Sequence, residues 1–348
     1  MEADFPPRIS LGQTPTPLQP LRRLQAELGG PLIWVKRDDL TGSVLSGNKV
    51  RKLEFIAAKA MAEGYDALVT CGGTQSNHCR ATALVAAQLG LKCHLILRDD
   101  GISRSRDDRP LELAGNRLLD QLSGAECTVV RRDRYFSELD QLFVQVIDDY
   151  AACGVKALKI PTGGSDATGV WGYFAACEEL AADFKRHDIQ PSAIVCATGS
   201  GGTQAGLTAG AAYFNLAAEV YGVNVCDDEA WFLDKVSQDI SDWQSDYAEF
   251  SAAKPQKYSI NVIDGYVGDG YGRANSSVYA TIKQLASTEG LVLDPVYSGK
   301  AFGGLLTEIE SGRFSGLDDD CNLVFIHTGG IFGLFPYANS LCNFDQTG

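Results

Sequence analysis

One lysine of this sequence has surroundings that suit the chemistry of a free amine. Lys49 opens the stretch KVRKLEFIAAKAM, a predicted helix because Ser46-Gly47-Asn48 form a start signal and good helix formers follow. On a period of 3.6 residues Lys49 falls in line with the apolar Leu53 and Ala60, so its side chain is expected to face the interior. Burial and the positive end of the helix dipole both disfavour an ammonium ion. We therefore expect a lowered pKa and a larger fraction of neutral amine, as imine formation with a carbonyl requires.

The other cations of this stretch are expected to reach water. Lys52 and Lys59 fall on a more mixed face of the helix, and Arg51 stands beside Glu54. An alternative for Lys49 itself stays open, because a long lysine side chain can extend to the surface and pair with an acid. The rest of the sequence has to decide between the two interpretations of this lysine.

A glycine-rich turn after a predicted strand is suited to binding a phosphate. In IVCATGSGGTQAGLTAG the strand is expected to end at Ala197, and an alanine-rich helix follows the turn. The turn consists of Thr198, Gly199, Ser200, Gly201, Gly202 and Thr203. Glycines let backbone N–H groups converge and the helix dipole adds positive potential, although a turn that only packs closely is the alternative. The segment matches neither a P-loop nor the dinucleotide fingerprint, so a single phosphate monoester fits better than a nucleotide.

A second polar cluster follows the predicted strand in ALVTCGGTQSNHCRATA. Ser76, Asn77 and His78 stand at or just inside the start of a helix. Serine and asparagine are common helix caps, which is the ordinary interpretation of this cluster. The functional interpretation is that the same side chains and the N–H groups of the helix start hold the carboxylate of a substrate. His78 is a candidate for substrate binding, and a packed histidine is its alternative.

Two more segments place hydroxyl groups at strand ends. In LDPVYSGKAFGGL, Tyr297 and Ser298 follow a turn that begins at Asp294. A tyrosine here could belong to the core, stack on a ring or act as an acid. In FIHTGGIFGLF, Thr328 ends a strand, and the glycines after it let the chain pass close to a ligand; a capping role is the alternative.

Together these segments predict an enzyme that uses pyridoxal 5'-phosphate. An inward-facing lysine, a phosphate-binding turn, a carboxylate site and a tyrosine that can stack are the parts that such an enzyme needs. The lysine forms an imine with the aldehyde of the cofactor, whose ring withdraws electrons from the α-carbon of an amino acid. The combination favours the functional interpretation of Lys49 over the ordinary one.

The elements that must position these residues indicate an α/β fold. Strand-like apolar runs alternate with helical stretches, which predicts parallel sheets with helices on both faces. The predicted strands are LIWVK, DALVTCGG, KCHLILR, ECTVVR, ALKIPTGG, AIVCATGSGG, AEVYGVNV, SINVIDGYV and NLVFIHTGG. Residues 101–110 are charged and without periodicity, and are expected to form a surface loop or lid. The polar stretch 238–257 is expected to be partly helical.

Composition narrows the classes of partner. The chain of 348 residues has a net charge of −14, which disfavours nucleic acid and anionic membrane surfaces as partners. No apolar run reaches the length of a membrane span, and the N-terminal residues do not resemble a signal peptide, so we expect a soluble cytoplasmic protein. The ten cysteines form no C-x-x-C pair, and with four histidines they predict neither a metal site nor a disulfide framework.

The segments quoted above also resemble one known family. In this order, TPTPLQPL, VKRDDLTGSVLSGNKVRKLEF, GGTQSNHCRATA, ATGSGGTQAGL, LDPVYSGKA and FIHTGG are similar to the D-cysteine desulfhydrase and 1-aminocyclopropane-1-carboxylate deaminase family. The resemblance runs from about Thr14 to Phe335. It implies the tryptophan-synthase-β-like fold type II of pyridoxal phosphate enzymes, with two open, twisted, mostly parallel sheets. It further implies a large domain of residues 1–48 and 163–348, a small domain of residues 49–162, and a homodimer.

The resemblance assigns roles by position. Lys49 is implied to be the Schiff-base lysine, Asn77 to bind the ring oxygen of the cofactor, and Ser76 to lie by the substrate carboxylate and α-carbon. The backbone of Gly199–Thr203 is implied to bind the phosphate. Tyr297 is implied to stack on the ring or to approach the substrate. Tyr271 in DGYG matches a tyrosine near the substrate, although the family often has proline at the position of Asp269.

Two positions discriminate within the family. Its deaminases carry glutamate and leucine where this chain has Ser298 and Thr328, the small hydroxyl pattern of the desulfhydrases, and both residues are expected beside the cofactor ring. A neutral hydroxyl near the pyridine nitrogen makes the ring a weaker electron sink than a carboxylate does, which suffices when a good leaving group departs from the β-carbon. The resemblance therefore implies β-elimination, with D-cysteine giving pyruvate, ammonia and hydrogen sulfide.

Other activities stay open at the level of sequence. Either Tyr271 or Tyr297 could be the acid for the leaving group. An L-cysteate sulfo-lyase is a rival, because Gly330–Gly333 (GIFG) departs from the usual desulfhydrase sequence. Ring opening of 1-aminocyclopropane-1-carboxylate is a further option. A relative that binds a ligand without turnover is the alternative that is not an enzyme.

Overall fold

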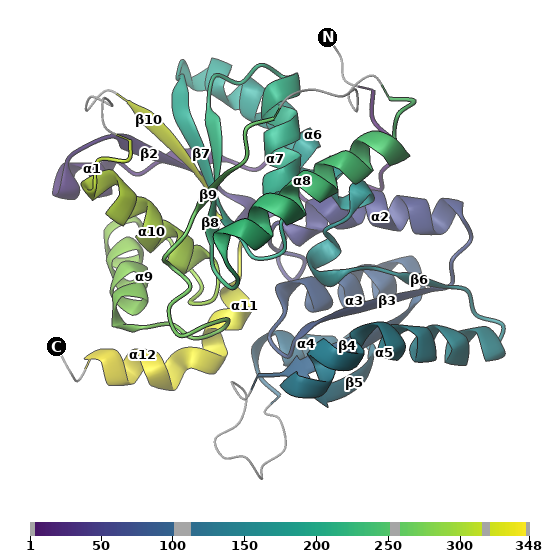
Figure 1. Cartoon of the computed structure of the whole chain (residues 1–348). Helices are drawn as coiled ribbons and strands as arrows, with labels where there is room; N and C mark the ends of the chain where they lie inside the picture. Colours follow the sequence, from purple (N-terminus) through teal and green to yellow (C-terminus); the bar gives the residue numbers. More distant parts are fainter. Residues whose placement is uncertain (1–3, 101–112, 251–257, 315–320, 346–348) are drawn as a thin grey trace.

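Two sheets organise the chain (Figure 1). The computed structural model describes residues 4–100, 113–250, 258–314 and 321–345. Within these residues the larger sheet has six strands in the order β1-β2-β10-β7-β8-β9, and the smaller sheet has four in the order β5-β4-β3-β6. All neighbouring strands are parallel except β1 and β2, which pair antiparallel. This is the predicted fold class.

The predicted strands all form. The larger sheet consists of β1 (Leu18–Pro20), β2 (Leu32–Lys36), β10 (Asn322–Ile326), β7 (Pro191–Thr198), β8 (Glu219–Asn224) and β9 (Asn261–Ile263). The smaller sheet consists of β5 (Glu126–Arg131), β4 (Lys92–Asp99), β3 (Ala67–Gly73) and β6 (Ala157–Lys159). Strand β1 was not predicted, because three residues ending in proline carry little signal and proline restricts a strand to the sheet edge.

Helices cover both faces of each sheet, as a parallel sheet requires. The helices are α1 (Arg22–Leu28), α2 (Lys49–Ala62), α3 (Asn77–Leu89), α4 (Gly115–Leu122), α5 (Arg132–Ala152), α6 (Ala167–His187), α7 (Gly202–Tyr213), α8 (Glu229–Asp246), α9 (Ser276–Glu289), α10 (Ser298–Glu310), α11 (Ile331–Leu334) and α12 (Ala338–Asp345). Residues of α9 and α10 pack on one face of the larger sheet, and residues of α6 and α7 on the other. Residues of α3 and α5 pack on opposite faces of the smaller sheet.

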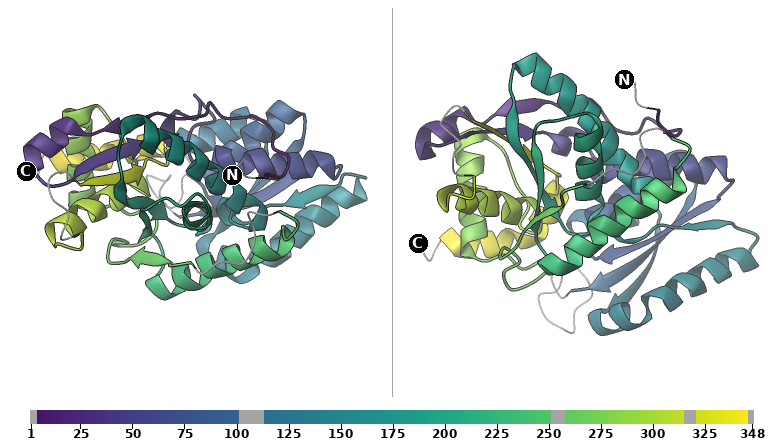
Figure 2. Two further views of the ribbon diagram at one scale, coloured as in Figure 1. Left: turned by 90° about the horizontal axis from the view of Figure 1, so that it is seen from above. Right: turned by 45° about the horizontal axis from the view of Figure 1, so that its top comes forward.

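The two sheets lie beside each other, and α2 lies between them (Figures 1 and 2). Helix α2 packs against α6 on one side and α3 on the other, so it has two buried faces. The expectation that Arg51 and Lys52 reach water is wrong, because both side chains are buried. Lys59 near the end of the helix is exposed as expected. A single apolar stripe predicts one buried face and cannot reveal a helix that is enclosed on two sides.

Several sequence predictions lie partly outside the described residues. The expected surface loop at 101–110 falls outside them, as does part of the polar stretch 238–257, whose first residues belong to α8. The smaller sheet is built from residues 67–159, and the proposed domain boundaries at 48 and 163 stay predictions. Over the described part of the chain, helices with the length and apolar character of a membrane span are absent.

Candidate active site

A cavity of about 410 Å³ lies where the carboxyl ends of strands from both sheets meet. Its lining comes from residues that follow β7, β8 and β10 of the larger sheet and β3 and β6 of the smaller sheet. In open α/β sheets this edge is where ligands bind, because helix N-termini also point there. The predicted site residues that line it are Lys49, Ser76, Asn77, His78, Gly199, Ser200, Gly201, Thr203, Tyr271, Tyr297 and Thr328.

Lys49 is the first residue of α2, and part of its side chain faces this cavity. Its amine donates a hydrogen bond of 3.1 Å to Oδ1 of Asn48, whose Nδ2 donates one of 3.0 Å to Oγ1 of Thr203. Burial lowers the pKa of Lys49 to about 8, with Asp294 opposing and Arg80 assisting the shift. The lowered pKa expected from the sequence is therefore found, and a single amide connects this amine to the glycine-rich turn.

The turn from Gly199 to Thr203 is built around close backbone approach. Gly201 precedes α7, and a Cβ atom on Gly202 would lie 2.7 Å from Oγ of Ser165 and 2.8 Å from the amine of Lys52. The N–H of Gly202 donates to Oγ of Ser165 at 3.2 Å, and that hydroxyl donates to Oγ of Ser200 at 2.8 Å. Only glycine at 202 lets an ammonium group lie so near the N-terminus of a helix.

Lys52 lies next to the lining residues Gly163 and Ser165 without itself lining the cavity, and the sequence did not reveal it. Its buried amine donates to the carbonyl oxygen of Gly163 at 3.1 Å and to Oγ of Ser165 at 3.0 Å. Burial holds its pKa well below the usual range, and the charge of Lys49 lowers it further. Among the residues that the structure describes, neither of these amines forms an ion pair with a carboxylate. The sequence contained one signal for this region. The PTGGSD segment after β6, which includes Gly163 and Ser165, is another strand end followed by glycines.

Asn77 is oriented by a neighbouring amide. Ser76 caps α3 by accepting a hydrogen bond of 3.2 Å from the N–H of Cys79, as the sequence predicts for a helix start. Oδ1 of Asn77, the first residue of α3, accepts a hydrogen bond of 2.9 Å from Nδ2 of Asn116. Because its oxygen is engaged in this way, Asn77 offers its NH₂ group to an acceptor in the cavity.

Arg80 and Asn116 hold this part of the site in place, and neither was predicted. Nε of Arg80 donates to Oδ1 of Asn116 at 2.9 Å, and its Nη2 donates to the carbonyl oxygen of Ser46 at 2.9 Å. Burial lowers the pKa of Arg80 to about 10. The guanidinium thus ties the chain before Lys49 to the helix start that carries Asn77.

Tyr271 and Tyr297 form a hydroxyl pair at the cavity. Their oxygens lie 2.5 Å apart, and burial raises the pKa of both phenols. The guanidinium carbon of Arg98 lies 4.8 Å from the centre of the Tyr271 ring, which is within cation–π range. Both phenols stay protonated near neutral pH, so one proton is shared between the two oxygens while the other remains available for donation.

Two of the predicted site residues, Ser298 and Gly202, are not among the described residues that line the cavity. Oγ of Ser298 donates to Oδ1 of Asp294 at 2.6 Å and accepts from the N–H of Asp294 at 2.8 Å. Thr328 lines the cavity, and its carbonyl oxygen accepts a hydrogen bond of 3.1 Å from the N–H of Asn48. The roles of Ser298 and Thr328 toward a cofactor ring stay predictions.

The residues present fit pyridoxal phosphate. The buried amine of Lys52 beside the N-terminus of α7 has no carboxylate partner among the residues described, and a phosphate bound there would stabilise its protonated form. The hydroxyl of Thr198 in the same turn is buried and finds no hydrogen-bond partner within the described part of the chain. Lys49 provides an amine with a lowered pKa on the same cavity. Within the described ranges, no group of three or more His, Cys, Asp or Glu could hold a metal ion.

Comparison with known proteins gives concordant results. The sequence profile of the family described as pyridoxal-phosphate dependent enzyme matches residues 9–329. A putative 1-aminocyclopropane-1-carboxylate deaminase of Thermotoga maritima is 42% identical over 96% of this chain and 99% of its own. A D-cysteine desulfhydrase of Klebsiella pneumoniae is 40% identical over 95% and 96%. An Arabidopsis thaliana protein named as bifunctional for both activities is 37% identical over 96% and 81%.

A solved structure described as an aminocyclopropane-carboxylate deaminase homologue has a TM-score of 0.85 to this chain. It is 34% identical, and the match covers 97% of this chain and 96% of the other. The diaminopropionate ammonia lyase of Escherichia coli has a TM-score of 0.64 at 16% identity, a likeness that concerns the fold alone.

Proposed function

The chain belongs to the family of pyridoxal-phosphate-dependent enzymes, and within it we propose a carbon–sulfur lyase that converts D-cysteine to pyruvate, ammonia and hydrogen sulfide. The observation that carries the proposal is the amine of Lys49, with its pKa lowered to about 8, on a cavity that also contains a phosphate cradle. A buried amine of this kind can bond a carbonyl and exchange a proton near neutral pH. Substrate and cofactor therefore meet at the N-terminus of α2.

The residues that hold the cofactor come from both sheets. When bound, pyridoxal phosphate supplies an aldehyde that bonds to an amine and a ring that withdraws electrons from the α-carbon of an amino acid. The backbone of Gly199–Thr203 and the amine of Lys52 would bind the phosphate, and the NH₂ group of Asn77 would donate to the ring oxygen. Thr328, which lines the cavity, would offer its hydroxyl to the ring nitrogen, and Ser298 would have to turn its hydroxyl away from Asp294 to do the same. The N–H groups at the start of α3, together with Ser76, bind the substrate carboxylate.

Proton movements are assigned to two sets of side chains. Lys49, when its amine is neutral, takes the proton from the α-carbon at Nζ. The hydroxyl pair of Tyr271 and Tyr297 donates a proton to the sulfur that leaves the β-carbon, and Arg98 fixes the ring of Tyr271 from the other side. Because the two phenols are in direct contact, either can donate while the other supports it by a hydrogen bond.

Small hydroxyls at 298 and 328 support D-cysteine over a cyclopropane substrate. A carboxylate near the ring nitrogen keeps that nitrogen protonated, whereas hydroxyls do so less strongly, and the weaker electron sink suffices for the departure of a thiolate. The 40% identity to a D-cysteine desulfhydrase supports the same choice. The second candidate is 1-aminocyclopropane-1-carboxylate deaminase, favoured by the 42% identity to the protein of that name. A cytoplasmic location and a homodimer remain part of the proposal.

A substrate panel tests the proposal. The protein loaded with pyridoxal phosphate is incubated with D-cysteine, L-cysteate and 1-aminocyclopropane-1-carboxylate, and sulfide, sulfite and 2-oxobutyrate are measured. We expect the highest kcat/KM with D-cysteine. Lys49→Ala lowers it by roughly three orders of magnitude or more and abolishes the visible band that borohydride traps, whereas Lys59→Ala, an exposed lysine of the same helix, changes neither.

Each other outcome of the panel has a defined meaning. A higher kcat/KM for 2-oxobutyrate release assigns the chain to the deaminases and refutes our interpretation of Ser298. Sulfite as the main product assigns it to the sulfo-lyases. A colourless protein that no borohydride treatment modifies at residue 49 would exclude the whole reaction class.

A further inference from the structure

Tyr271 lies on an irregular segment, residues 264–275, between β9 and α9. Four of its glycines have φ values between 62° and 117°, in the left-handed region that favours glycine. A Cβ atom on Gly265 or Gly270 would meet no described atom within 4 Å beyond its chain neighbours, so packing does not fix the backbone at these glycines. The position of Tyr271 therefore depends on contacts that other elements make with this segment.

One face of α10 lies along the segment. Lys300, Gly304 and Glu308 recur every four residues, so they share this face of the helix. A Cβ atom on Gly304 would lie 3.0 Å from Cγ of Tyr266, whose hydroxyl donates to Oε1 of Glu308 at 2.7 Å. Glycine at 304 thus lets the segment approach the helix closely.

Lys300 makes the contact of this face that is nearest to Tyr271 in the sequence. Its side chain is 2% exposed, and its amine donates to the carbonyl oxygens of Val267 at 2.5 Å and Gly270 at 2.9 Å. The second carbonyl belongs to the peptide unit from which Tyr271 begins. An ammonium group in the first turn of a helix is disfavoured by the helix dipole, and the two carbonyl oxygens offset that cost. Without the amine, both oxygens would lose their shared donor.

The other phenol of the pair is held at the start of the same helix. Tyr297 immediately precedes α10, and Lys300 lies in the first turn. The N–H of Tyr297 donates to Oδ2 of Asp294 at 2.9 Å, which fixes the chain at this helix start. Lys300 therefore connects the helix start that carries Tyr297 to the segment that carries Tyr271, whose hydroxyl oxygens lie 2.5 Å apart.

We propose that Lys300 is a positioning residue that sets the contact between Tyr271 and Tyr297 and thereby the direction in which the pair donates its proton. The inference rests on the proposed function, in which this pair protonates the leaving sulfur. Lys300 acts through the phenols, since it is not among the residues that line the cavity. On the other side of Tyr271, the hydroxyl of Tyr337 donates to the carbonyl oxygen of Gly272 at 2.6 Å and holds the same segment.

Two substrates with different leaving groups separate this role from a merely structural one. A proton assists the departure of sulfur, whereas chloride leaves without one, so β-chloro-D-alanine does not need the phenols. In the enzyme loaded with pyridoxal phosphate, Lys300→Met is expected to lower kcat for D-cysteine by roughly tenfold to a hundredfold, with KM changed less than about twofold. The kcat for β-chloro-D-alanine should change less than about twofold. Equal losses with both substrates, or no loss with either, would overturn the proposal.

A double-substitution cycle shows whether Lys300 acts through the phenols. Tyr297→Phe removes one hydroxyl of the pair, so adding Lys300→Met to it should lower kcat for D-cysteine by less than about twofold further. Losses that multiply would show two independent contributions and refute the proposal. Lys283→Met replaces an exposed lysine of the neighbouring α9 and is the control, which should leave kcat for both substrates unchanged.

Hydrogen exchange of the loaded enzyme without substrate gives a readout that does not depend on turnover. In Lys300→Met the amides of residues 265–273 should exchange at least about tenfold faster, while those of α5 stay unchanged. Lys300→Gln keeps an NH₂ donor, should give a smaller increase, and takes the place of Lys300→Met if that variant does not fold. Unchanged exchange of this segment, or an equal increase in α5, refutes the proposal. If D-cysteine proves not to be the substrate, the proposed function fails, but the exchange still decides whether Lys300 holds the segment of Tyr271.

Discussion

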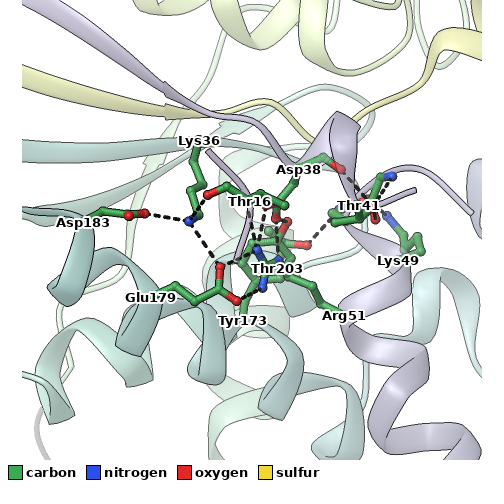
Figure 3. Close-up of polar contacts among 12 residues, drawn as sticks. Thr16, Lys36, Asp38, Thr41, Lys49, Arg51, Tyr173, Glu179, Asp183 and Thr203 are labelled. Carbon is green, nitrogen blue, oxygen red and sulfur yellow. Dashed lines mark hydrogen bonds and ion pairs between the residues drawn. The ribbon is translucent and has the colours of Figure 1, made fainter. Parts of the chain in front are cut away.

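Arg51 and Lys52 are consecutive residues of α2, and both are buried, but their electrostatic surroundings are opposite. Arg51 donates to both oxygens of Asp38 at 2.8 and 2.9 Å and forms a second pair with Glu179 at 2.8 Å (Figure 3). These carboxylates hold the pKa of Arg51 well above its usual value. Lys52 contacts a carbonyl and a hydroxyl, and its pKa is lowered. One side of the helix therefore has matched buried charges, and the other has a buried amine without an ion pair among the residues described.

The matched region extends beyond Arg51. Lys36 binds Asp183 at 2.7 Å and Glu179 at 3.2 Å. Asp38 also accepts hydrogen bonds from the hydroxyls of Tyr173 at 2.6 Å and Thr16 at 2.7 Å. Each buried charge in this group has an opposite charge in contact, as a low-dielectric interior requires.

The contrast between the surroundings of Arg51 and Lys52 indicates different roles for the two sides of α2. A complete set of ion pairs needs no further partner and fixes α2 against α6 and β2. An ammonium group next to a helix N-terminus, without an ion pair among the residues described, is stabilised only when an anion arrives. The difference between two neighbours on one helix thus separates a structural network from a binding site.

Arg51→Met should give the largest effect on stability. It leaves the buried carboxylate of Asp38 without its ion-pair partner, and breaking a buried pair in this way costs about 3–5 kcal/mol. Urea unfolding followed by circular dichroism measures the loss. Arg134→Gln, which removes an exposed ion pair with Glu138, should cost less than about 1 kcal/mol. A loss for Arg51→Met no larger than that of this control would show that the matched network does not stabilise the fold.

Lys52→Met should have the opposite effect, with stability retained and affinity for the cofactor reduced. Removing an unmatched buried cation should leave the stability of the protein without cofactor unchanged or increased. Its affinity for pyridoxal phosphate should fall by roughly tenfold to a hundredfold, because a charge-assisted contact to the phosphate is lost. Equilibrium titration of the visible band measures the affinity. Lys59→Met is the control on the exposed part of α2, and equal affinities for the two variants would remove Lys52 from the phosphate site.

The sequence predicted the parts of the site that depend on local signals. Strands that end in glycine, the cap at Ser76 and the apolar stripe below Lys49 are each encoded within a few residues, and the residues they single out lie at the sheet edge that contains the cavity. Because the carboxyl ends of parallel strands share one edge, separate segments could be assigned to one site without knowledge of their contacts.

The remaining site residues depend on contacts between distant segments. Lys52 is buried because α2 is enclosed by α6 and α3, which no periodicity within α2 can indicate. Asn116 and Arg80 are separated by 36 residues, and the predicted Tyr271 and Tyr297, whose mutual contact the sequence did not indicate, by 26. Their hydrogen bonds exist only after the strands have paired, so propensity and pattern carry no information about them.

The smallest expected effect concerns the pH at which the amine of Lys49 on α2 becomes reactive toward an aldehyde. Burial lowers the pKa of Lys49 from 10.5 to about 8, and the neutral amine is the form that attacks an aldehyde. Since the protonated form dominates below this value, the rate of imine formation between the protein and pyridoxal phosphate should rise about tenfold per pH unit up to pH 8 and level off above it. Stopped-flow absorbance of the visible band measures the rate.

Lys300 provides the matched control for this profile. Burial lowers its pKa to about 8 as well, but its amine is bound to the carbonyl oxygens of Val267 and Gly270 and it is not among the residues that line the cavity. The midpoint near pH 8 should therefore persist in Lys300→Met. A midpoint near 10.5 in the unmodified protein would mean that the amine of Lys49 is as solvated as that of an exposed lysine, and the contrast between the two sides of α2 would lose its functional meaning.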